Sequence, residues 1–357
     1  MTMDLALIRC HTQRLAGAPF ASVLEAVQWF GAVQAQDFGG ALWAIGQRSA
    51  DLTASQVHQA VADRQIVRTW PLRGTIHFVP AADVRWMLAL TGARQNERSW
   101  SVLRSMGLDL AILEAGRKVL ETALRDHALT RPEIYAHFES QGIVTEKGAG
   151  LHILGYWAQA GLICFGPHRG KQPTFVLLDD WLAGVDSRSL DREGSLKMLA
   201  LRYFQSHGPA TDRDFAWWSG LTLTMAREAM ALVGERLRKS VSGDMTLWSL
   251  DMAPPDRPAP NGLLHLLSPF DELLVAYKDR AAYDRVPGAP DEAITFFRPS
   301  VLLNGRLVGS WQKTLGTKSG RVDLHFVGDP EVVASELVQA QLARLSHFWE
   351  QPIGQNQ

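Results

Sequence analysis

The sequence contains two glutamines separated by one small residue. Their side-chain type and spacing are the most direct indication of chemistry in the chain. Gln34, Ala35 and Gln36 follow an apolar segment, and Asp37 comes next. A carboxamide both donates and accepts hydrogen bonds, so a pair of them can orient a polar group if both face the same way. On an extended backbone they do, whereas on a continuing helix they diverge by roughly 200°. The alternative is that both amides end a helix and bond its backbone.

The elements around the glutamines favour a break in the helix. The segment "SVLEAVQWFGAV" predicts a helix capped by Ser22, with Glu25 three residues on. Asp37 and the pair Gly39-Gly40 then interrupt it. The Asp37 carboxylate could stabilise a positive charge or cap the following helix "GGALWAIGQR", and we favour the cap.

Other common catalytic patterns are missing from the sequence. It contains no H-E-x-x-H, no Cys/His metal spacing and no G-x-S-x-G. "GPHRGKQ" resembles a phosphate loop only superficially, and we interpret it as a turn. The adjacent acids Asp179-Asp180 and Asp271-Glu272 are expected in solvated loops or caps, because strand neighbours point to opposite faces.

Length and composition set broader limits. At 357 residues the chain predicts two to four structural units. It has no apolar run of membrane-spanning length, and its N-terminus does not resemble a signal peptide. Two cysteines, Cys10 and Cys164, make neither a disulfide framework nor a metal set, so we expect a cytoplasmic protein. The net charge of −1 leaves a local basic surface possible.

Three segments begin alike, and each is followed by a predicted hairpin. Their capping signals are Thr53 with Gln56, Thr130 with Glu133, and Thr211 with Asp214. The strand pairs are "QIVRTW" with "GTIHFV", "GLICFG" with "TFVLLD", and "RKSVS" with "MTLWSL". Helices followed by a two-stranded hairpin, three times over, are typical of winged-helix units. The alternative is three unrelated α+β pieces.

The last third of the chain has a different pattern. "GLLHLLSPFDELLVAY" and "PSVLLNGRLVGSWQ" predict antiparallel strands, with Asn304-Gly305 as a hairpin turn. "DPEVVASELVQAQLARLSHFWE" predicts a helix with a proline near its first turn, and "PIGQNQ" a frayed tail. The Pro-rich stretch 251–262 predicts a linker.

Four motifs resemble the bacterial winged-helix DNA glycosylases that unhook alkylated bases and azinomycin-type interstrand crosslinks. They are "AVQAQDFGGALWAIGQR", "VRTWPLRGTIHFVPAADV", "SHGPATDRDFAWWSGL", and "LSPFDELLVAYKDR" with "VLLNGRLVGSWQ". Together they cover nearly the whole chain in order. The resemblance implies an α+β fold of three tandem winged-helix units arranged as a C around DNA, plus a β-rich C-terminal part with a terminal helix. We expect these parts at residues 1–100, 101–188, 189–255 and 256–357.

The resemblance also implies where catalysis occurs. The family signature, Gln–aliphatic–Gln, falls on Gln34, Ala35 and Gln36. A sibling branch has an acid in the third place, but here the acid is one position later, so its role is not transferred to Asp37. We expect the two glutamines to hold the attacking water at the anomeric carbon, without metal or cofactor. No lysine at the motif could form a Schiff base, so we expect a monofunctional enzyme.

Several basic residues are candidates for phosphate contacts. The wing tip with His168, Arg169 and Lys171 is the preferred contact, followed by the run Arg236 to Lys239 and the hairpin turn with Lys313, Lys318 and Arg321. Arg68 and Arg73 could also meet phosphate, but a buried arginine joining two units is an equal alternative for that stretch. His77 is expected in the core.

Two classes of function follow. The first is a monomeric DNA glycosylase acting on double-stranded DNA with alkylated purines, bulky or crosslinked lesions included. The second is a non-catalytic winged-helix DNA-binding protein or regulator. A regulator usually pairs half-sites through a dimerisation element, and the sequence shows no coiled-coil heptads, which favours the enzyme.

Overall fold

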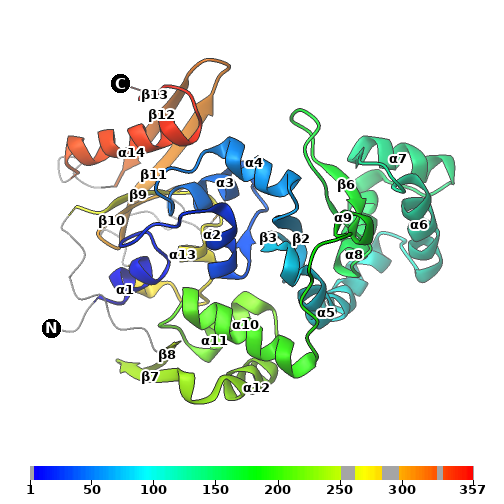
Figure 1. Cartoon of the computed structure of the whole chain (residues 1–357), viewed down its shortest axis with the longest axis horizontal. Helices are drawn as coiled ribbons and strands as arrows, with labels where there is room; N and C mark the ends of the chain where they lie inside the picture. The colour runs from blue at the N-terminus through cyan, green and yellow to red at the C-terminus, as the bar shows by residue number, and fades with distance from the viewer. Residues whose placement is uncertain (1–3, 251–261, 284–296, 328–332, 357) are drawn as a thin grey trace. The chain divides into compact units, whose positions relative to one another are not determined.

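A computed structural model describes residues 4–250, 262–283, 297–327 and 333–356 (Figure 1). Its contacts divide the chain into two compact units. The first contains Met1–Val57 and Lys197–Gln357, and the second contains His58–Leu196. The sequence predicted four consecutive segments. The two units are a coarser division, and the first of them includes both ends of the chain. Within the described ranges, no helix is long and apolar enough to cross a membrane.

The second unit combines helices with a sheet whose strands lie in the order β3-β2-β5-β6-β4. The turn Arg73-Gly74 joins β2 to β3 with φ values of 55° and 71°, the type I′ geometry that suits a two-residue hairpin loop. The elements are β2 (Ile66–Leu72), β3 (Thr75–Pro80), α5 (Val84–Ser105), α6 (Leu110–Ala123), β4 (Leu129–Thr130), α7 (Arg131–Ser140), α8 (Ala149–Gln159), β5 (Ile163–Phe165), β6 (Thr174–Leu177) and α9 (Leu178–Trp181).

Helices α5 and α8 approach each other closely in this unit. A Cβ at Gly92 of α5 would collide with the carbonyl oxygen of Gln159, so only glycine permits the contact. The predicted capping box of Thr130 and Glu133 begins α7, and the short strand β4 just before it pairs with β6. Helices α7 and α8 are followed by the hairpin of β5 and β6, so the predicted order of helices followed by a two-stranded hairpin is confirmed here.

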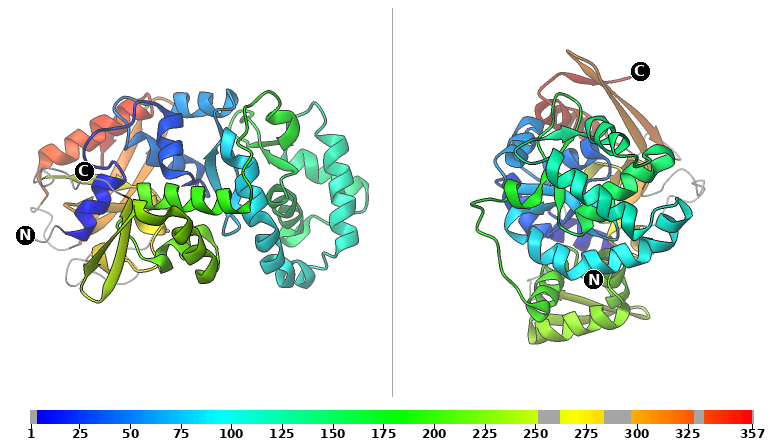
Figure 2. Two further views of the ribbon diagram at one scale, coloured as in Figure 1. Left: turned by 60° about the horizontal axis from the view of Figure 1, so that its bottom comes forward. Right: turned by 90° about the vertical axis from the view of Figure 1, so that its right-hand side faces the viewer.

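The first unit contains the N-terminal helices and a second helix-and-hairpin set. In the left view of Figure 2 the hairpin β7–β8 extends beside α11 and α12, and Ala210, just before α11, bridges to Trp248 of β8. The capping boxes at Thr53 and Thr211 are both formed. The elements are α1 (Leu5–Thr12), α2 (Val23–Phe30), β1 (Val33–Gln34), α3 (Phe38–Gly46), α11 (Asp212–Ser219), α12 (Leu223–Val233), β7 (Leu237–Ser242) and β8 (Met245–Leu250), while α4 (Ala54–Ala62) and α10 (Arg192–Ser206) cross the unit boundary.

The C-terminal part of the first unit is β-rich, as expected. Its sheet has the order β13-β12-β11-β10-β9, and α14 (Ser335–Phe348) lies along it (Figure 1). Asn304 and Gly305 form the predicted turn with φ values of 51° and 82°. The remaining elements are β9 (Leu264–Leu267), α13 (Glu272–Val275), β10 (Ser300–Leu303), β11 (Arg306–Leu315), β12 (Gly320–Phe326) and β13 (Ile353–Gln355).

Two expectations for this part were wrong. The tail is not frayed, because Ile353 is buried and begins β13, which pairs in parallel with β12. Residues 272–275 form a short helix and not a strand, because the Asp271 side chain accepts a hydrogen bond from the N–H of Leu273 and caps the turn. The linker expected at 251–262 falls almost entirely outside the described residues, and so does Pro330.

Candidate active site

The predicted break after the apolar helix is present. Helix α2 ends at Phe30, and Gly31 caps it with a φ of 76°, a conformation that favours glycine. A Cβ on Gly31 would also lie 2.9 Å from the Cβ of Arg202, so a side chain would clash there. The chain then extends through β1, which places Gln34 on a strand and Gln36 two residues further on. The continuous helix that would separate the two amides is not formed.

The three residues of the motif differ in exposure. Gln34 is only 6% exposed, Ala35 is completely buried, and Gln36 is exposed. A buried Ala35 leaves no room for a larger side chain without repacking, which accounts for the small residue between the amides. That both carboxamides face the same surface stays a prediction.

Asp37 has the capping role that we favoured. Its side chain accepts a hydrogen bond from the backbone N–H of Gly40 and begins α3. A Cβ on Gly40 would lie 2.8 Å from the Asp37 Oδ1, so glycine at this position lets the cap form. The residue itself is exposed.

Lys313 of β11 lies beside this cap, although it is remote from the motif in sequence. Its Nζ and the Asp37 Oδ1 are each 3.9 Å from the point that a Cβ on Gly39 would occupy. The ammonium also lies 4.4 Å from the ring centroid of Trp349, a cation–π distance. Burial lowers the pKa of Lys313 to about 8, and the nearby Asp37 carboxylate partly opposes the shift. Sequence reasoning treated Lys313 only as a phosphate contact and found no lysine at the motif.

A buried carboxylate lies behind the motif. Glu272, at the start of α13, is 1% exposed, and its Oε1 accepts the backbone N–H of Gln34 at 2.7 Å. Its Oε2 lies 3.1 Å from the indole N–H of Trp218 and 3.2 Å from Nε2 of His207. Of the two alternatives expected for Asp271-Glu272, the cap is present, because Asp271 caps α13, but the solvated loop is wrong, because both side chains are buried. The one available signal was their place inside the motif "LSPFDELLVAYKDR".

The neighbouring acid, Asp271, holds the far end of the same motif. Arg48 makes hydrogen bonds of 2.6 and 2.9 Å to its two oxygens, and the Gln47 amide donates to it at 2.8 Å. All three side chains are buried. Gln47 and Arg48 end the segment that begins with the two glutamines. Asp271 and Glu272 thus hold the two ends of this segment.

The candidate phosphate contacts of the second unit differ in how much of them is accessible. Arg68 is 6% exposed and lies 4.4 Å from the Phe165 ring, which favours the alternative of an arginine that joins the two hairpins of the sheet. His77 is buried, as expected. Arg73 is half-buried in its turn.

The wing tip is exposed, but part of it is already engaged. Arg169 pairs with Glu133 at 2.6 Å and also donates to the Ala128 carbonyl, whereas Lys171 is exposed. His168 packs edge-on against His58, and burial lowers its pKa to about 4, so it would meet a phosphate as a neutral group. In the first unit, Lys318 and Arg321 are exposed on the β11–β12 hairpin.

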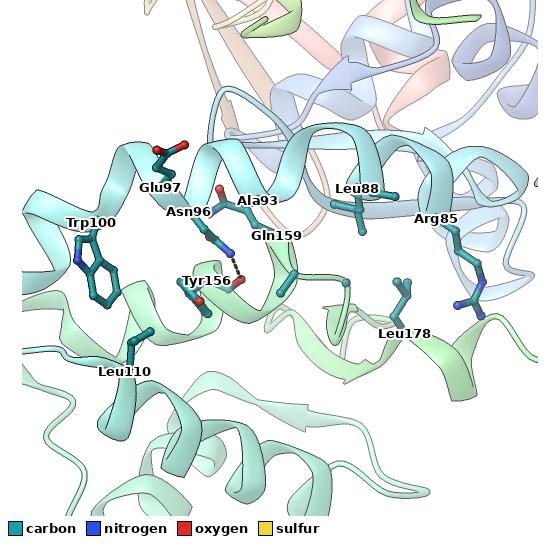
Figure 3. Close-up of a pocket in the computed structure, with 13 residues that line it drawn as sticks. Arg85, Leu88, Ala93, Asn96, Glu97, Trp100, Leu110, Tyr156, Gln159 and Leu178 are labelled. Carbon is teal, nitrogen blue, oxygen red and sulfur yellow. Dashed lines mark hydrogen bonds between the residues drawn. The ribbon is translucent and has the colours of Figure 1, made fainter. Parts of the chain in front are cut away.

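The second unit also has a groove of about 830 Å³ between α5, α8 and their neighbours (Figure 3). It is lined by apolar and aromatic residues such as Leu88, Trp100 and Tyr156, with the Asn96 amide bonded to the Tyr156 carbonyl. None of its lining residues belongs to the glutamine motif. Among the described residues, no group of three or more His, Cys, Asp or Glu side chains could hold a metal ion.

Comparisons with known proteins agree with the resemblance seen in the sequence. Residues 27–348 match the family model of AlkZ-like DNA glycosylases. The interstrand DNA cross-link repair glycosylase of Streptomyces sahachiroi is 27% identical over 307 residues, 78% of this chain and 79% of that protein. The solved structure of the Streptomyces sahachiroi DNA glycosylase AlkZ shares the fold, with a TM-score of 0.78 at 23% identity over 99% of this chain and 98% of that one. The chain therefore belongs to the AlkZ-like DNA glycosylase family.

Proposed function

We propose that this protein is a monofunctional, monomeric DNA glycosylase that hydrolyses the N-glycosidic bond of N7- or N3-alkylated purines in double-stranded DNA, bulky and crosslinked adducts included. The observation that carries the proposal is the break after α2, where Gly31 ends the helix and the chain continues as the short strand β1 (Val33–Gln34), so Gln34 and Gln36 do not lie on one continuous helix. This backbone lets residues two apart face the same way, which one water molecule shared by two amides requires.

The chemistry needs little acid catalysis. An alkylated purine of this kind is cationic, so the electron pair of the glycosidic bond leaves with the base and neutralises it. Water bonds to the anomeric carbon, and its proton passes to solvent. The amide oxygens of Gln34 and Gln36 would stabilise the positive charge that develops on the sugar, and together they would hold the water in line.

We also propose that the three helix-and-hairpin sets are winged-helix units that contact DNA. Two of them have a feature typical of that architecture, a short segment before the helix that pairs with the second hairpin strand. These are β4 with β6, and Ala210 with Trp248. The exposed cations Lys171, Lys318 and Arg321 support backbone contacts on the wing tip and on the β11–β12 hairpin.

The decisive experiment is base release. Duplex DNA carrying N7-methylguanine, a bulkier N7 adduct or a defined crosslink is incubated with excess protein, and free base and abasic sites are measured in single turnover. The proposal expects both products in equal amounts, without strand cleavage. A protein that binds these duplexes and releases no base from any of them would be a non-catalytic DNA-binding protein instead.

A further inference from the structure

The Glu272 carboxylate connects three segments of the first unit that are far apart in the sequence. It accepts hydrogen bonds from the backbone of Gln34 on one oxygen and from Trp218 on the other, where His207 also lies. A carboxylate buried to 1% exposure is costly unless donors surround it. These contacts therefore hold it in one orientation.

His207 is arranged as a further donor to this carboxylate. Its Nε2 faces Oε2 of Glu272, and its ring stacks on Tyr203 with centroids 4.9 Å apart. Burial lowers the pKa of His207, so the ring is neutral near pH 7. A neutral ring with its proton on Nε2 donates to Oε2, whereas the other tautomer would place a lone pair against the carboxylate.

The hydrogen bond between Gln34 and Glu272 constrains the first glutamine of the motif. It is made to the backbone N–H, so it constrains the backbone of Gln34 without occupying the carboxamide. The adjacent Asp271 fixes Arg48 at the other end of the segment. The start of the short helix α13 thus holds both β1, which carries Gln34, and Arg48, which follows α3.

We propose that Glu272 is a positioning residue for excision, which holds the backbone of Gln34 so that its carboxamide meets the reacting centre. This inference rests on the proposed function. Glu272 lies behind the motif and acts through Gln34, so substrate binding does not depend on it. Misplacing a group at the reacting centre by about 1 Å can cost on the order of 10²-fold in rate.

The test compares two buried acids. Glu272→Gln keeps the shape of the side chain but replaces one acceptor oxygen by a donor. Asp214→Asn is the matched control, because Asp214 is also buried and also accepts backbone N–H groups, those of Thr211 and Lys278. The melting temperature of both variants is determined first. Single-turnover base release and DNA affinity are then measured well below it. We expect Glu272→Gln to slow release by roughly 10- to 100-fold with DNA affinity within about twofold, and Asp214→Asn to keep its rate.

A second comparison separates positioning from general stability. If Glu272 acts through Gln34, Glu272→Gln should slow a Gln34→Ala enzyme by less than about threefold, because groups acting as a unit are not additive. A folded Glu272→Gln with a wild-type rate overturns the inference, and so does an undiminished effect in the Gln34→Ala background.

Hydrogen exchange provides a readout that does not need activity. The peptide containing Gln34 should exchange faster in Glu272→Gln than in the wild type or Asp214→Asn. If Glu272→Gln fails to fold, Trp218→Phe takes its place. It removes one donor to Oε2 of Glu272 and should raise exchange in the same peptide. Unchanged exchange in these variants overturns the inference. A wild type that releases no base overturns the proposed function instead, while the exchange comparison still tests the constraint on Gln34.

Discussion

The guanidinium of Arg48 binds the carboxylate of Asp271 through two hydrogen bonds of 2.6 and 2.9 Å, with side chains only 1% and 0% exposed. Arg48 is the last residue of the first family motif, and Asp271 lies in the last one. The pair therefore ties the glutamine segment to the C-terminal part of the first unit. Paired and fully hydrogen-bonded charges can be buried in this way, but either charge left alone cannot.

Breaking this pair should destabilise the protein strongly. Asp271→Ala leaves the Arg48 guanidinium buried without its counter-charge, and we expect a loss of about 3–5 kcal/mol in the free energy of unfolding. The measurement is urea denaturation followed by tryptophan fluorescence. Arg117→Ala is the control, because Arg117 pairs with Glu114 and Glu121 on a partly exposed helix face, where ion pairs add little to stability, so this variant should lose far less than Asp271→Ala. Equal losses for the two variants would contradict the buried pair's importance.

Binding to DNA should depend on the exposed cations of the wing. Replacing Arg169 and Lys171 by Ala should weaken binding and lower the slope of log affinity against log salt by up to about 2, since each phosphate contact contributes about 0.9. Affinity for an undamaged duplex is measured between about 50 and 200 mM salt, because binding through phosphate contacts weakens steeply over this range. Glu133→Gln is the matched control, because it releases Arg169 from its ion pair, keeps the cation, and still allows a capping box with Thr130. An unchanged slope in the double variant would exclude this wing from the interface.

The parts of the fold that follow from neighbouring residues could be predicted from the sequence. Thr130 and Glu133 are three positions apart, and Asn304-Gly305 fixes its own turn, so caps and hairpins were found where they were expected. The burial of Asp271 and Glu272 was not predicted, because their partners lie more than 200 residues away, with separations of 223 and 238. An acid next to Leu, Phe and Pro in the sequence gives no sign that an arginine and a backbone N–H will meet it in the core.

The two glutamines should control the rate of excision and not the affinity. Gln34→Ala or Gln36→Ala is expected to slow base release by roughly 10²–10³-fold, by analogy with the loss of one preorganised polar contact to a reacting centre. The double variant should lose less than the product of the single losses. Single-turnover release from DNA with N7-methylguanine measures the rate, and a binding titration measures the affinity.

Asp37→Asn provides the internal comparison for the glutamines. It removes the charge but keeps an oxygen that can accept the Gly40 N–H, so the cap of α3 survives and the effect should be small. If Asp37→Asn abolishes excision while the glutamine variants remain active, the carboxylate is the catalyst and the assignment to the amides is wrong.

Lys313 should make DNA binding sensitive to pH above neutrality. In the free protein its pKa is about 8, below the ordinary value of 10.5, so the cation is lost as the pH rises through 8. A bound phosphate favours the charged form, so binding takes up a proton, and affinity should fall by up to about tenfold per pH unit above 8. Lys313→Arg keeps its charge and should show a flatter profile between pH 7 and 9. Identical profiles for the two proteins would mean that Lys313 does not contact phosphate.

The same lysine gives the sharpest test of a monofunctional enzyme. An amine with a pKa of about 8 beside Asp37 is partly deprotonated near neutral pH and could attack the anomeric carbon of an abasic site. We expect Lys313 to pair with phosphate, as predicted from the sequence, and to stay against the Trp349 ring, so borohydride should trap no covalent protein–DNA complex during base release. Lys313→Gln should then lower affinity and leave the nature of the products unchanged. A trapped complex in the wild type that disappears in Lys313→Gln would show a Schiff base at this amine, and the enzyme would be a lyase as well as a glycosylase.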